Sequence, residues 1–79
     1  MKFIVKANKD CSYTYNGYVY FLPFDFYTTV QLEDNTPDWE VKANAKPNLM
    51  KQIAAKLFGS IKLWKRVYLD YSDIEIERA

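Results

Sequence analysis

Four carboxylates near the end of the chain are the side chains best suited to acid–base chemistry: Asp70, Asp73, Glu75 and Glu77. Paired carboxylates catalyse proton transfer when burial or a neighbouring charge moves their pKa values apart. The last three alternate with Ile74 and Ile76, which predicts one solvated acidic face on a short strand. Carboxylates so exposed have neither burial nor a close partner to tune their pKa values. These residues therefore predict a charged surface rather than a catalytic pair.

Other catalytic and metal-binding arrangements lack the residues that they need. The chain has no histidine, which removes the commonest general base and metal ligand. Its two glycines, Gly17 and Gly59, are too far apart to form a phosphate-binding loop. The single cysteine, Cys11, makes no internal disulfide and no cysteine-based metal site, and we expect it to be a small buried residue opposite Leu22. We therefore expect no enzymatic activity, no metal and no cofactor.

Tyrosines surround the strongest turn signal in the chain. Asn16-Gly17 lies between two alternating runs, which predicts a hairpin with a two-residue turn. Opposed residues of such a hairpin share a face, so four tyrosines gather on one side: Tyr13, Tyr15, Tyr18 and Tyr20. Two interpretations of this face carry equal weight, the roof of a core and a binding surface for a protein partner.

A second group of residues interleaves basic and aromatic side chains. Residues 61–71 alternate at period two, with an outward row made of Lys62, Trp64, Arg66 and Tyr68. The simplest interpretation is a solvated face whose charges discourage edge-to-edge pairing of strands. The alternatives are a patch that docks on a protein and a single-stranded nucleic-acid site, in which Trp64 and Tyr68 stack on bases while Lys62, Lys65 and Arg66 bind phosphates.

The remaining elements follow from hydrophobic periodicity. Strands are expected at 3–5, at 24–33 with Phe26 and Val30 inward, and at 38–44, where Trp39, Val41 and Ala43 alternate with polar residues. A helix is expected at about 47–58, beginning near Pro47 and closed by Gly59. The short last strand carries Ile74 and Ile76.

Together these elements predict the α+β class. We expect an antiparallel β-sheet of about five to six strands with one amphipathic α-helix (about 47–58) packed on one face, in the order β-β-β-β-β-α-β(-β). At 79 residues, 18% of them aromatic, the chain is expected to form a single globular domain over residues 1–79. The lone cysteine and the absence of a long apolar run predict a cytoplasmic protein with no membrane association.

Charge is unevenly distributed although the net charge is +1. Residues 41–69 carry seven basic and no acidic side chains, whereas 33–40 and 70–77 carry four acidic side chains each. Acidic flanks would repel phosphate, so a protein partner is favoured over nucleic acid. In size and composition the chain resembles the small single-domain proteins with which phages and other mobile elements block a host machine, anti-CRISPR proteins among them. Many inhibitors of nucleic-acid machines imitate DNA with strong negative charge, and this nearly neutral chain departs from that pattern.

The leading hypothesis is a non-catalytic binding protein that docks on a protein partner and inhibits or modulates it. Its contact residues are expected to be the four tyrosines of the hairpin and the row at Lys62, Trp64, Arg66 and Tyr68. One alternative is the single-stranded nucleic-acid binder. Another is a structural subunit that self-associates by adding strands edge to edge, and the expected state is a monomer or a weak homodimer.

Overall fold

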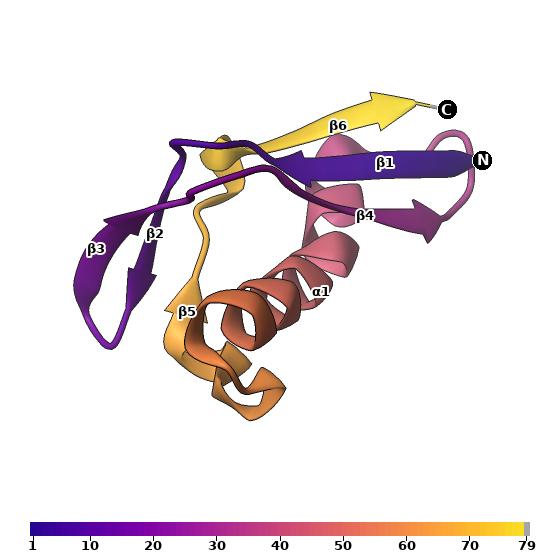
Figure 1. Cartoon of the computed structure of the whole chain (residues 1–79). Coiled ribbons are helices and arrows are strands. Elements are labelled where there is room, and N and C mark those ends of the chain that lie inside the picture. Colours follow the sequence, from indigo (N-terminus) through magenta and orange to yellow (C-terminus); the bar gives the residue numbers. More distant parts are fainter. Residues whose placement is uncertain (79) are drawn as a thin grey trace.

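The computed structural model describes residues 1–78 and is of the α+β class (Figure 1). One long helix, α1, accompanies two short 3₁₀ helices, η1 and η2, and six strands. The helices are α1 (Asp38–Phe58), η1 (Ile61–Arg66) and η2 (Tyr71–Asp73). The strands are β1 (Lys2–Ala7), β2 (Ser12–Tyr15), β3 (Tyr18–Phe21), β4 (Phe26–Gln31), β5 (Val67–Tyr68) and β6 (Ile74–Arg78).

The strands form two antiparallel sheets instead of the single sheet that we expected. The first sheet has the order β4-β1-β6, and the second has the order β3-β2-β5. Asp10, with φ of 72°, lies in the turn that separates β1 from the hairpin. Leu22 to Asp25 then lie outside any strand between β3 and β4. These breaks allow the hairpin to leave the first sheet and pair with β5 (Figure 1).

The predicted strand at 38–44 is wrong, because these residues form the first turns of α1. Val41, Ala45, Leu49 and Ile53 recur every fourth residue and are fully buried, so one apolar stripe continues along the whole helix. Pro47 lies inside the helix rather than at its start. The end of the helix is as predicted, since Gly59 adopts the left-handed conformation with φ of 75°.

The predicted strand at 61–71 is also wrong over most of its length. Residues 61–66 form η1, which packs against α1, and only Val67 and Tyr68 remain in a strand. A 3₁₀ helix brings residues three apart to the same side, so the expected alternation of inward and outward residues ends there. Leu63 and Trp64 are half-buried, and Val67 and Leu69 are buried in the core.

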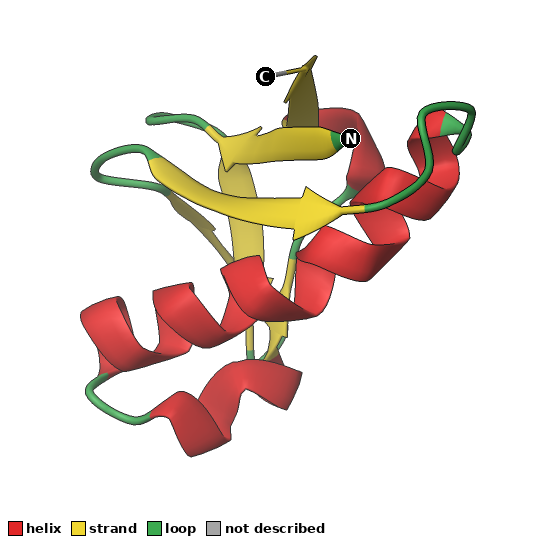
Figure 2. Ribbon diagram, turned by 90° about the vertical axis from the view of Figure 1, so that its right-hand side faces the viewer, coloured by secondary structure: helices red, strands yellow, loops and turns green. Residues whose placement is uncertain are grey.

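The core lies between α1 and the two sheets. Phe3, Val5 and Ala7 of β1 are fully buried, and Figure 2 shows α1 running along the sheet that contains them. In β4 the predicted phase is confirmed, because Phe26 is buried while Tyr27 is exposed. The predicted last strand is also present as β6, with Ile74 buried.

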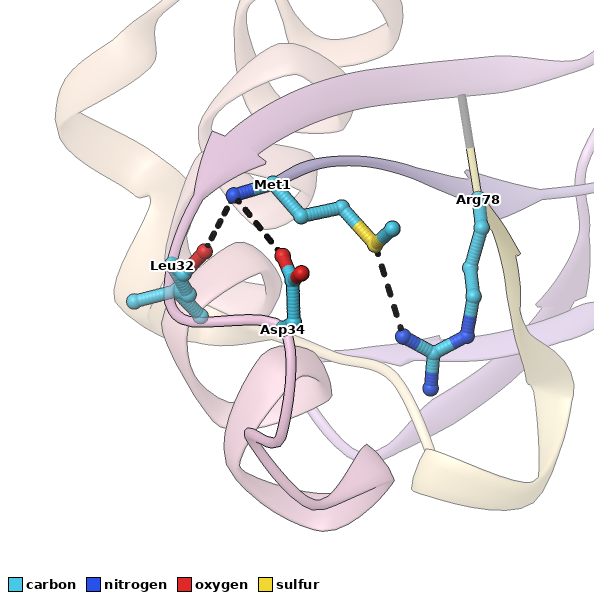
Figure 3. A network of polar contacts seen from close by, with 4 residues as sticks. All are labelled: Met1, Leu32, Asp34 and Arg78. Atoms are coloured by element: carbon cyan, nitrogen blue, oxygen red, sulfur yellow. Dashed lines mark hydrogen bonds and ion pairs between the residues drawn. The ribbon is translucent and has the colours of Figure 1, made fainter.

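Polar contacts join the two ends of the chain to the end of β4 (Figure 3). The N-terminal ammonium donates to the Leu32 carbonyl at 2.8 Å and lies 3.4 Å from the Asp34 carboxylate. The Arg78 guanidinium contacts the sulfur of Met1 at 3.7 Å. These contacts hold the first sheet together at the end remote from the tyrosine hairpin.

Candidate protein-docking surface

The tyrosine hairpin forms with the predicted turn and register. Asn16 and Gly17 have φ of 51° and 83°, so both central residues of the turn are left-handed as a type I′ turn requires. Tyr15 pairs with Tyr18, and Tyr13 pairs with Tyr20. The structure therefore places the four predicted tyrosines on one face of β2 and β3.

Phe58, at the end of α1, packs against three of the four tyrosines. Its ring stacks on Tyr15, with centroids 3.8 Å apart and planes 8° apart. Tyr13 and Tyr20 contact Phe58 edge to face at 6.2 Å, and they stack on each other at 5.7 Å. Sequence reasoning placed Phe58 only in the apolar stripe of the helix. The local sequence signal is that Phe58 directly precedes the helix-ending Gly59, where the chain turns and the last side chains of the helix can meet another element.

The tyrosine face is buried in one part and exposed in the other. Tyr13 is only 5% exposed and Tyr15 is half-buried, so these two side chains pack in or against the core. Tyr18 is 71% exposed, and Tyr20 is 42% exposed. The part of the face available to a partner is therefore the β3 side of the hairpin.

Exposed aromatic residues continue from the hairpin into β4. Among residues 1–78, six of the eleven exposed large hydrophobic residues fall between positions 18 and 27: Tyr18, Val19, Tyr20, Phe21, Phe24 and Tyr27. Tyr18 and Tyr20 lie on one face of the hairpin, and Val19 and Phe21 lie on the other. Exposed apolar surface gathered in one part of a molecule commonly marks an interaction site. This segment is called the aromatic segment below.

A groove lies where the aromatic segment meets α1. Phe24, Phe26 and Tyr27 form one side, Gln52, Ala55 and Lys56 form the other, and the groove has a volume of about 550 Å³. Gln52 donates from its side-chain amide to the Tyr27 carbonyl at 2.9 Å, which fixes the two sides to each other. Ala55 lies three residues before Phe58, so the groove and the tyrosine cluster adjoin on the same side of the helix.

Asp25 and Lys56 supply the charge of this groove. The Asp25 carboxylate accepts a hydrogen bond from the Lys9 backbone amide at 2.7 Å. Lys56 takes part in none of the ion pairs formed among residues 1–78. The groove therefore offers an incoming ligand apolar and aromatic walls with one available cation.

The predicted alignment of basic and aromatic side chains along one strand face is wrong. Lys62, Trp64 and Arg66 lie on η1, whereas Tyr68 follows in β5, so they do not share one strand face. Lysine ammonium groups lie over the rings that were expected to stack on bases. Lys51 is 5.0 Å and Lys65 is 5.8 Å from the centroid of the Trp64 ring, and Lys46 is 4.0 Å from that of Tyr68.

The lysines that lie over the Trp64 and Tyr68 rings would compete with a nucleobase for the same ring faces. Lys46 also lies 4.5 Å from the Tyr71 ring, and its burial there lowers the pKa of its ammonium group. Cation–π contacts of this kind occupy the faces that a nucleobase would stack on. The arrangement favours a structural role for Trp64 and Tyr68 over base stacking.

Three acidic residues of the C-terminal segment make polar contacts within the protein. Glu77 pairs with Lys6 at 3.0 Å, Glu75 accepts from the Asn8 side chain at 2.8 Å, and Asp70 accepts from the Ser72 amide at the start of η2. Half-buried Cys11 contacts the Asp73 carbonyl with its sulfur at 3.7 Å. No group of three potential metal-ligating residues occurs in the described part of the chain.

The burial of Tyr13 predicts a loss of stability at high pH. Desolvation raises the pKa of its phenol above the ordinary value of 10.0, and the neighbouring Tyr20 raises it further. Above about pH 10 the unfolded chain loses this proton more readily than the folded chain, so the free energy of unfolding falls as pH rises. Urea unfolding at about pH 9 and about pH 11 should show a smaller loss for Tyr13→Phe than for the unchanged chain. Equal losses in the two proteins would contradict this assignment.

Comparison with known proteins finds no relative from which a function could be transferred. No family model matches the chain, and no curated protein and no solved structure matches it either. Within residues 1–78, no helix is both long and apolar enough to cross a membrane.

Proposed function

We propose that this chain is a non-catalytic binding protein that docks on a protein partner and inhibits or modulates it. The observation that carries the proposal is the concentration of exposed large hydrophobic residues in the aromatic segment, next to a groove of about 550 Å³. A domain of this size has limited apolar surface with which to build its core, so leaving so much of it exposed in one segment costs stability. Binding to a partner gives that exposure a function.

The chemistry of the segment favours a protein over a nucleic acid. Tyrosine offers a large, rigid contact area with a polar tip and is enriched among the residues that dominate protein interfaces. Residues 11–24 carry no charged side chain, so phosphate would find no cation along the hairpin. The aromatic rings that do lie beside lysines, Trp64 and Tyr68, have those lysines over their faces.

The partner is proposed to contact Tyr18 at the hairpin and Phe24 and Tyr27 at the groove. Lys56 would pair with a carboxylate of the partner at the edge of the groove, where such a contact adds specificity more than affinity. The size of the chain and its resemblance in composition to phage and mobile-element inhibitors support a host protein complex, such as a defence complex, as the class of target.

Capture from a lysate of the source cell or its host tests this proposal. The immobilised chain should retain a specific protein, and Tyr18→Ala and Tyr27→Ala should each reduce retention at least about tenfold, as expected of central aromatic contacts. Both side chains are well exposed, so neither change should unfold the protein. Trp39→Ala is the matched control, because Trp39 is 65% exposed and lies at the opposite end of α1.

Two results would overturn the proposal. One is capture that Trp39→Ala reduces as much as Tyr18→Ala and Tyr27→Ala do. The other is tight binding of a labelled single-stranded oligonucleotide that weakens steeply with salt, since that dependence is the signature of phosphate contacts. A tyrosine-centred protein interface should depend little on salt.

A further inference from the structure

Strand β3 presents an unpaired edge of the second sheet. The sheet has the order β3-β2-β5, so one side of β3 has no neighbouring strand. The pair that flanks a two-residue turn is hydrogen-bonded, and the pairs then alternate along the hairpin. Tyr18 and Tyr20 therefore bond to β2, and the hydrogen bond that the Leu22 amide donates to the Cys11 carbonyl at 2.9 Å continues the pattern. The backbone groups of Val19 and Phe21 point outward.

The two edges of the first sheet, β4 and β6, show how an edge is normally protected. Along β4, Gln52 caps the Tyr27 carbonyl, and the Asn48 side chain bonds to the Thr28 hydroxyl at 3.3 Å. β6 carries Glu75 and Glu77, whose charges oppose pairing with another strand. Among the hydrogen bonds of residues 1–78, none joins a side chain of α1 to the main chain of β3. β3 also carries no charge, and its four side chains are all exposed.

We propose that β3 pairs antiparallel with β3 of a second copy of this chain. In the register that satisfies the outward groups, Tyr20 faces Tyr20 of the second copy, and each Val19 faces Phe21 of the other copy. The two Val19–Phe21 pairs then exchange four main-chain hydrogen bonds. The result is a continuous six-stranded sheet with a two-fold axis at Tyr20.

The charge and shape of the hairpin favour a second copy of the chain as the occupant. A two-fold interface places each residue near its own counterpart, so any net charge in the segment would repel itself. Residues 11–24 carry none. Val19 and Phe21 would form a β-branched and aromatic pair across the strands, and the two Tyr20 rings would meet on the other face. In Figure 1, β3 is the outermost element on its side of the molecule, so no helix blocks the approach.

Sedimentation velocity over a range of concentrations tests self-pairing. The unchanged chain should shift from monomer toward dimer between about 10 μM and about 1 mM, because an interface of a few residues is weak. Val19→Pro removes one outward donor from each copy, two of the four bonds, and should weaken association at least about tenfold. The donor lost points away from β2, so the hairpin itself keeps its bonds.

A second variant keeps the test decisive if proline disturbs the hairpin. Val19→Lys leaves the main chain intact and adds the charge that natural edges use against pairing, so it too should abolish association. Trp39→Lys is its matched control, since Trp39 and Val19 are 65% and 63% exposed. At high concentration, the amides of residues 19 and 21 should become protected from hydrogen exchange in the unchanged chain and in Trp39→Lys, but not in Val19→Lys.

The proposal fails if the chain stays monomeric throughout this range, or if Val19→Lys associates as strongly as Trp39→Lys. A monomer that instead binds a synthetic apolar strand at these two amides would overturn self-pairing in favour of a partner's strand. The proposed function fails separately. Partner capture is measured below about 10 μM, where the chain is monomeric, and sedimentation is followed up to about 1 mM. Tyr27→Ala should reduce capture without changing sedimentation, whereas Val19→Lys should change sedimentation toward the upper end of this range.

Discussion

Replacing Phe58 with alanine is expected to lower the free energy of unfolding by about 2–3 kcal/mol. The ring is half-buried, but it stacks on Tyr15 at 3.8 Å and also contacts Tyr13 and Tyr20. Removing it opens a gap under the hairpin that three aromatic side chains line. A chain of this length is stable by only about 4–12 kcal/mol, so the change is a large fraction of the total.

Urea unfolding measures this effect, and Phe24→Ala is its control. Phe24 also stacks on an aromatic ring, Phe26, with centroids 5.0 Å apart, but it is 41% exposed. Its replacement should cost about 1 kcal/mol or less. Hydrogen exchange in Phe58→Ala should also accelerate in β2 and β3 before it does so in β1, because the hairpin loses its packing on α1. Equal losses in the two variants would mean that Phe58 does not hold the hairpin.

Local signals predicted the parts of the fold that depend on neighbouring residues. The hairpin follows from Asn16-Gly17, and the end of the helix follows from Gly59, since both require left-handed backbone. The burial phase of β4 follows from its period of two. In each case the residues that determine the structure lie within a few positions of one another.

The parts that were wrong depend on partners distant in the sequence. Val41 fits a period of two with Trp39 and Ala43, and it equally fits a period of four with Ala45 and Leu49. Seven residues are too few to distinguish a period of two from a period of four. The helix is favoured because it buries Val41, Ala45 and Leu49 together against the sheets. The pairing of β2 with β5, across about fifty residues of chain, likewise has no local signal.

The candidate site divides in the same way. The turn predicted that four tyrosines share a face, which the structure confirms. The division of that face between core and solvent depends on where Phe58 arrives, and that position depends on the full length of α1. The predicted helix began at Pro47, nine residues after the observed start at Asp38. A helix that lacks these residues cannot be placed correctly along the sheets, so the position of Phe58 beside the hairpin could not be predicted.

Pro47 yields the second large prediction, because it stabilises neither the start nor the end of a helix in this position. It lies in the tenth position of α1, where its missing N–H leaves the Ala43 carbonyl without its usual helical donor. Proline at such an interior position costs about 3 kcal/mol relative to alanine, and the stiffening of the unfolded chain returns about 0.4–1 kcal/mol. Pro47→Ala should therefore raise the free energy of unfolding by about 2 kcal/mol.

Pro37 is the matched control, and its replacement should have the opposite sign. It lies at the N-cap with φ of −67°, an angle that proline adopts without strain. A backbone N–H at this position would have no acceptor within the helix, so proline costs no helical hydrogen bond there. Pro37→Ala loses only the stiffening of the unfolded chain and should lower the free energy of unfolding by about 0.4–1 kcal/mol. Urea unfolding of the two variants compares them directly. If Pro47→Ala is neutral or destabilising, the proline ring or a bend that it imposes on α1 contributes to packing against both sheets, and the helix needs that break to reach the hairpin with Phe58.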